Sequence, residues 1–249
     1  MPALLGVRYL LRMSRQTQWI DALDAAGART TLWRRLARPF DDAAPPALAS
    51  WLVAAIVGAV SGLAGWALGL VVPHAVALIL TAALWCGLEL GLPERSVAAR
   101  AQAFDRTAPM SGQFVVTFAV LLRVAALSTL PRSQWIAGLA LATIFGRLQA
   151  VFLQFIADPL DEERNTTADY LTQPTSAVWF AALAAITLAL ATLAFGWRLA
   201  LGMAIATVTT FVVGLLHQRG RDSIAVEILG VVVWLGELIA LFAIADGHG

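Results

Sequence analysis

The feature that most constrains the fold is a series of apolar stretches, each roughly 20 residues long, which is the length of an α-helix that crosses a bilayer. Because lipid offers no partners to backbone polar groups, such segments must form helices that satisfy their own hydrogen bonds. The sequence therefore predicts an all-α fold, a polytopic membrane helix bundle of about seven transmembrane helices. Hydropathy windows place these helices at Leu48–Leu70, His74–Leu92, Phe114–Leu130, Trp135–Ile156, Ala177–Phe195, Arg198–Leu216 and Ser223–Ala245.

Composition agrees with a membrane protein and excludes several other classes. Hydrophobic residues make up 59% of the 249 residues and charged residues 13%, whereas soluble domains have about 45–50% and about 25%. A net charge of +1 excludes the concentrated basic surface that nucleic-acid binding needs. Cys86 is the single cysteine, so neither a disulfide framework nor a cysteine metal cluster is expected. The composition therefore makes the lipid bilayer an expected partner and excludes nucleic acid.

The distribution of arginines between loops predicts the orientation. With a cytoplasmic N-terminus, the opposite side holds only Arg132 and Arg198 among the loop arginines, which fits the positive-inside rule. We expect a multi-pass protein of the bacterial-type inner membrane. On this scheme residues 1–47 form a cytoplasmic or interfacial segment, 48–245 the transmembrane domain and 246–249 a tail. The first 20 residues lack the continuous apolar region and the cleavage site of a removable signal peptide, so none is expected there.

Glycines in the first predicted helix indicate close helix packing, because small residues four apart let helix backbones approach each other. They are Gly58, Gly62, Gly65 and Gly69. The acidic segment 157–169, by contrast, is interpreted as a solvated cytoplasmic loop, with a second metal or cation site as the alternative.

Five charges within the apolar stretches are the most informative residues, since each costs about 2.5–3.5 kcal/mol at a helix centre unless it is paired or faces a polar cavity. They are Glu89, Arg123, Arg147, Glu227 and Glu237. Helical rise places Glu237 about 15 Å beyond Glu227, and Arg123 deeper in the third helix. We therefore expect Glu89, Arg147 and Glu227 at one depth, near the cytoplasmic face.

Two interpretations of these charges remain open. In the first, Arg147 pairs with Glu89 or Glu227, and Arg123 with Glu237, to fix helix register. In the second, carboxylates and arginines line a cytoplasmic cavity for a phosphate-bearing substrate, where carboxylates hold Mg²⁺ and an arginine clamps the transferring phosphoryl group. The second interpretation predicts phosphoryl transfer.

Taken in order, several segments resemble cobalamin synthase, the adenosylcobinamide-GDP ribazoletransferase family. The Gly-punctuated first span, the run "ALWCGLELGLPERSVAARAQAFDR", the arginine-bearing "IFGRLQAVFLQF" and the closing "RGRDSIAVEILGVVVWLGELIALFAI" are similar to the corresponding family segments. The closing segment is the most specific, and it aligns Gly230 with a family glycine and Glu227 with a family aspartate. The family's H-x-D-G-x-x-D motif is shortened here, with Glu89 in the place of its histidine, Gly91 near its glycine and its aspartates missing. Trp234 stands where a glutamate is expected.

The resemblance implies the roles of particular residues. Glu227, Arg147 and Glu89 are the predicted catalytic residues, and Arg147, Arg95 and Arg221 the predicted substrate-binding residues. The implied ligands of a Mg²⁺ cofactor are Glu89, Glu94, Asp105 and Glu227.

The reaction implied joins α-ribazole, or its 5′-phosphate, to adenosylcobinamide-GDP and releases GMP late in cobalamin biosynthesis. One alternative is a catalytically inactive relative that acts as a membrane scaffold or subunit. A small transporter is the second alternative, since intramembrane charges also line transport paths. The sequence leaves open whether the protein forms a homo-oligomer or a membrane complex.

Overall fold

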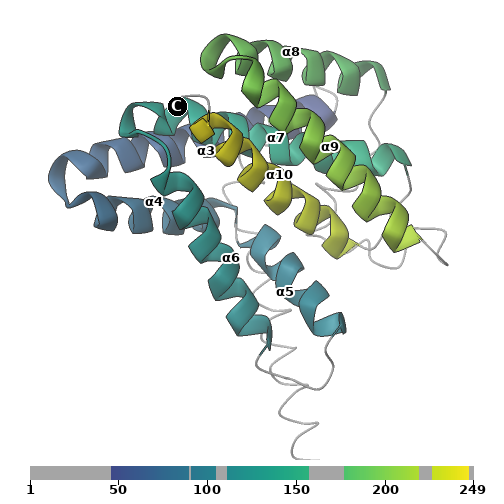
Figure 1. The fold of residues 1–249 in the computed structure, drawn as a ribbon, viewed down its shortest axis with the longest axis horizontal. Helices are drawn as coiled ribbons and strands as arrows, with labels where there is room; N and C mark the ends of the chain where they lie inside the picture. Colours follow the sequence, from purple (N-terminus) through teal and green to yellow (C-terminus); the bar gives the residue numbers. More distant parts are fainter. Residues whose placement is uncertain (1–45, 90, 105–110, 157–176, 219–225, 247–249) are drawn as a thin grey trace, which may run out of the picture.

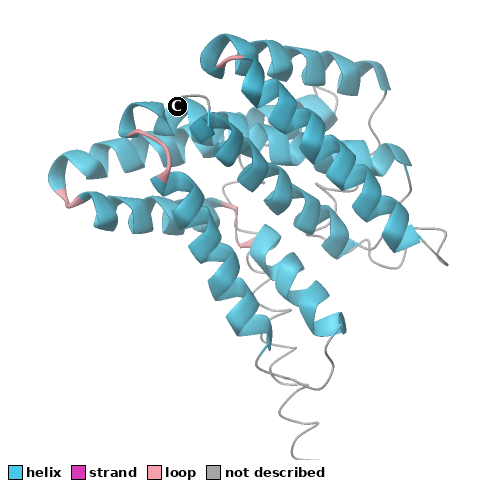
Figure 2. Cartoon of the chain, in the orientation of Figure 1, coloured by secondary structure: helices cyan, strands magenta, loops and turns pink. Residues whose placement is uncertain are grey.

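The computed structural model describes residues 46–89, 91–104, 111–156, 177–218 and 226–246, and within these ranges all regular structure is helical (Figures 1 and 2). This confirms the all-α prediction. The elements are α3 (Pro46–Val71), α4 (His74–Leu88), α5 (Leu92–Phe104), α6 (Ser111–Ser128), the 3₁₀ turn η1 (Arg132–Gln134), α7 (Trp135–Ile156), α8 (Ala177–Phe195), α9 (Trp197–Gln218) and α10 (Val226–Asp246). Residues 1–45, the acidic segment 157–169 and the tail 247–249 lie outside the described residues.

Five of the described helices are long and apolar enough to cross a membrane, and there are six candidates if α4 and α5 form one bent span. The membrane bundle is thus supported with five or six spans in the described residues, against the seven expected. The difference lies in the second and third predicted spans. The second breaks at Glu89, and the third is α6, whose apolar part is shorter and carries Arg123.

Helices α3, α7 and α10 form the centre of the bundle. A Cβ added at Gly58 would meet the α7 backbone at Ala140, and one at Gly62 would meet Ile136, so α3 and α7 run antiparallel with their backbones in close contact. This confirms the packing predicted from the glycines. Helix α10 crosses α7 equally closely, with the Cα of Gly146 only 3.1 Å from a Cβ built on Gly236.

Helices α8 and α9 lie at the outside of this centre. Figure 1 shows α9 running beside α10, with α8 beyond it. Only 22% of the α8 span is buried inside the protein, against 72% of the span that contains α7. The exposed remainder is apolar, including Leu193 and Val178, as a lipid-facing helix requires.

The chain breaks sharply between α4 and α5. Glu89 ends α4, Gly91 takes a positive φ of 60°, and Pro93 stands in the first turn of α5, where its missing N–H costs nothing. The two helices meet at an angle of 83°. The expectation of one continuous helix to Leu92 is therefore wrong. The segment that follows the break forms α5, which packs against α6 and α10. We call residues 89–94 the elbow.

Candidate functional site

A single guanidinium collects three carboxylates in the interior of the protein. Arg123 of α6 donates from Nη2 to Oε2 of Glu237 on α10, and the same nitrogen lies 2.8 Å from Oε2 of Glu89. Its Nε lies 3.0 Å from Oε1 of Glu94 on α5. Arg123, Glu89 and Glu237 are 0% exposed, and Glu94 is 1% exposed. The elbow, α6 and α10 therefore meet at one buried charge cluster.

The last turn of α4 lines one side of this cluster. The guanidinium carbon of Arg123 lies 4.1 Å from the ring centroid of the fully buried Trp85, close enough for a cation–π contact. Cys86 accepts from Nη1 of Arg123 at 3.6 Å, and its thiol donates to Oε1 of Glu94 at 3.5 Å. The last turn of α4 and the elbow together surround the guanidinium with an aromatic face, a thiol and carboxylates.

Arg147 stands at the edge of the cluster. Its Nη2 is 3.9 Å from Oε1 of Glu89, and at 7% exposure it is the least buried of these charged residues. Gly146, the residue before Arg147, allows α10 to pack closely against α7 at this point. A Cβ at Gly146 would lie 2.7 Å from both Cγ of Glu237 and the carbonyl oxygen of Val233, so only glycine lets α10 approach this closely. We define the charge cluster as Glu89, Glu94, Arg123, Arg147 and Glu237.

The structure brings together some of the predicted site residues and leaves others apart. Glu89, Glu94 and Arg147 lie in the charge cluster, whereas Arg95 is on the exposed side of α5. Asp105, Arg221 and the side chain of Glu227 lie outside what the structure describes. The backbone of Glu227 is in the first turn of α10, about 15 Å along the helix axis from Glu237.

The expected separation of the charges into two depths is wrong. Arg123 and Glu237 lie at the same place as Glu89, because the break after Leu88 brings the end of α4 to their level. The expected pairs are nevertheless confirmed, since Arg123 contacts Glu237 and Arg147 approaches Glu89.

Two residues of the charge cluster, Arg123 and Glu237, were not among the predicted site residues. Their charge within apolar helices was the available signal. Their positions in the sequence did not indicate that they would contact Glu89, because this contact depends on the elbow. The Gly91-Leu92-Pro93 sequence was the sign that the second helix would break there.

The described carboxylates do not fit the implied magnesium ion. Their oxygens converge on the guanidinium of Arg123, which already supplies a cation at that point. Within the described ranges, no group of three or more His, Cys, Asp or Glu side chains could hold a metal ion. Of the four predicted ligands, Asp105 and the side chain of Glu227 are not described.

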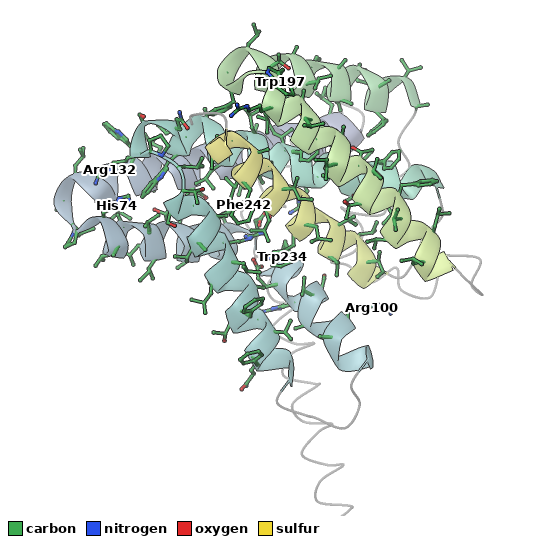
Figure 3. All side chains as sticks on the ribbon, viewed as in Figure 1. His74, Arg100, Arg132, Trp197, Trp234 and Phe242 are labelled. Atoms are coloured by element: carbon green, nitrogen blue, oxygen red, sulfur yellow. The ribbon has the colours of Figure 1, made fainter. Side chains whose placement is uncertain are left out.

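Trp234 occupies the position where the resemblance expects a glutamate. It is 8% exposed and packs in the main apolar core, one turn before Glu237 on α10 (Figure 3).

Most of the charge cluster lies in a region of the chain that matches a known protein family. Residues 105–245 match the cobalamin-5-phosphate synthase family, a region that includes Arg123, Arg147 and Glu237. Neither a curated protein nor a solved structure matches the chain. Since the matched region covers more than half of the sequence, the chain belongs to the cobalamin-5-phosphate synthase family.

Proposed function

We propose that the protein is a membrane-embedded transferase of cobalamin biosynthesis that joins α-ribazole, or its 5′-phosphate, to adenosylcobinamide-GDP. A ribazole hydroxyl attacks the phosphorus nearest cobinamide, the bridging P–O bond breaks, GMP leaves and the hydroxyl proton is released. The family match over residues 105–245 carries this proposal.

Arg147 is the residue that we assign to the phosphate. It is a permanent cation with a planar fork of donors, which suits phosphate oxygens. It lies in the family-matched region and is the most exposed member of the charge cluster. In this assignment Arg147 stabilises the charge that develops on the transferring phosphoryl group.

Glu89 takes a supporting role in this proposal. We assign this carboxylate to holding Arg147 in place, because it is fully buried, with Oε2 2.8 Å from Nη2 of Arg123 and Oε1 3.9 Å from Nη2 of Arg147. Glu227 remains the candidate base, and magnesium dependence remains a prediction, since neither Asp105 nor the side chain of Glu227 is described.

The test is release of GMP from adenosylcobinamide-GDP by membranes that contain the protein. Arg147→Gln should lower kcat/KM by about 10²- to 10³-fold, the usual loss when one donor to a developing oxyanion is removed. Arg132→Gln is the control, because it removes an arginine in η1, before the start of α7, and should leave turnover unchanged. Absence of GMP release above an empty-vector membrane, with substrate access verified, would contradict the proposal.

A membrane scaffold or subunit is the second candidate. The observation that favours it is that Arg123 already engages all three carboxylates of the charge cluster. It predicts that Glu227→Gln leaves cellular function intact while substitutions that disrupt helix packing abolish it. Complete loss of function from Glu227→Gln would reject the scaffold.

A further inference from the structure

Arg123 touches both sides of the elbow. Glu89 is the residue that ends α4, and Glu94 lies in the first turn of α5, so the two carboxylates flank Gly91. The guanidinium forms an ion pair with Glu89 through Nη2, at 2.8 Å, and with Glu94 through Nε, at 3.0 Å. A planar group with five donors can hold two carboxylates at once in this way, whereas a lysine ammonium is a single point charge.

The contact of Arg123 with Glu89 and Glu94 lies in a buried place, where its loss is costly. Arg123, Glu89 and Glu237 are completely buried, so solvent does little to screen the carboxylates from one another. Arg147, the other arginine in the charge cluster, lies 3.9 Å from Oε1 of Glu89, farther than the 2.8 Å between Arg123 and Oε2 of the same carboxylate. Removing Arg123 therefore leaves buried carboxylates without their principal cation, which strongly disfavours the closed arrangement.

We propose that Arg123 is a positioning residue. Its guanidinium holds Glu89 and Glu94, on the two sides of the elbow, and through Glu89 it fixes the position of Arg147. Its effect on turnover rests on the proposed transferase function. Its effect on the elbow does not, and can be measured without substrate.

Cys86 supplies a built-in reporter of the elbow. It is the single cysteine of the chain, and its sulfur contacts both Arg123 and Glu94. The measurement is the rate at which N-ethylmaleimide labels the full chain in native membranes. Arg123→Gln should label on the order of tenfold faster than wild type, because labelling follows the free energy of local opening. Arg198→Gln, which removes an arginine exposed at the start of α9, should label at the wild-type rate.

A double variant separates positioning from simple charge balance. The charge cluster holds three carboxylates and two guanidiniums, a formal charge of −1, and Arg123→Gln/Glu237→Gln leaves two and one, again −1. We expect this variant to accumulate in membranes at the wild-type level, while N-ethylmaleimide labels its Cys86 rapidly. Its kcat/KM for GMP release should be at least roughly tenfold below wild type, because a misplaced reacting group lowers the rate.

The outcomes discriminate clearly. Slow labelling of Arg123→Gln, or of the well-accumulated double variant, would overturn the proposal, because the elbow would then close without the clamp. Rapid labelling of both supports it. If wild type releases no GMP, the transferase proposal fails, and the labelling rates alone still decide whether Arg123 holds the elbow.

Discussion

Glu237 shows how the neighbours of one side chain decide the cost of changing it. In the charge cluster the carboxylates outnumber the guanidiniums by one, so the arrangement carries an excess negative charge in a buried place. Removing a carboxylate reduces that excess, and removing a guanidinium increases it. Replacing Glu237 by a neutral residue should therefore cost much less stability than replacing Arg123 by one.

We predict that Glu237→Gln lowers the free energy of unfolding by less than about 1 kcal/mol, whereas Arg123→Gln lowers it by about 3–5 kcal/mol, the cost of an uncompensated buried charge. The glutamine still offers Arg123 an acceptor oxygen. Denaturant titration of the purified proteins in detergent measures both values. Equal losses in the two variants would show that the ion pair, and not the balance of charge, determines stability here.

The elbow is the element whose shape depends on one glycine. Gly91 has a φ of 60°, which side-chain-bearing residues adopt at a cost of roughly 1–2 kcal/mol. Gly91→Ala should therefore destabilise by about that amount. Gly87→Ala is the matched control four residues earlier, because Gly87 is helical and a Cβ there would meet nothing within 4 Å. The control should be neutral or more stable by up to about 1 kcal/mol. A comparison of the two unfolding midpoints measures the difference, and similar effects would contradict the elbow geometry.

The crossing of α7 and α10 depends on a second glycine. A Cβ at Gly146 would press on the carbonyl oxygen of Val233, which is backbone and cannot move aside. Gly146→Ala should cost about 1–3 kcal/mol, as overpacking usually does, and should move Glu237 away from Arg123. On the same helix, Gly138 has as its nearest neighbour the end of a leucine side chain, Cδ1 of Leu130 at 3.1 Å. Gly138→Ala should be tolerated better, and the reverse order of stability would contradict this crossing.

Helix directions determine where the two ends of the described chain lie in the whole molecule. α3 and α7 are antiparallel, and α10 is antiparallel to α7, because Gly146 faces Val233 while Gly138 faces Ile244. The end of α3 also meets the start of α7, where the rings of His74 and Trp135 lie 5.6 Å apart and where Figure 3 labels His74 and Arg132. It follows that α3 and α10 are parallel, and that Pro46 and Asp246 lie at opposite ends of the bundle.

This arrangement predicts the location of the C-terminus. If the arginine-rich N-terminal segment is cytoplasmic, as the positive-inside rule predicts, the end of α10 lies on the other side of the membrane. A C-terminal alkaline phosphatase fusion should be active and a green fluorescent protein fusion dark. A fluorescent C-terminal fusion would contradict the predicted orientation.

Apolar stretches of bilayer length determined the helical membrane fold, and charges within those stretches identified several residues of the charge cluster, because both are properties of single segments. The spans at α3, α7, α8 and α9 needed no tertiary information. Arg123 and Glu237 join Glu89 only through tertiary contacts. That meeting depends on the elbow at Gly91 and on the close approach at Gly146, both of which bring together residues far apart in the chain. Hydropathy averages over a window and does not register a turn of two or three residues, yet this turn sets which charges share one guanidinium.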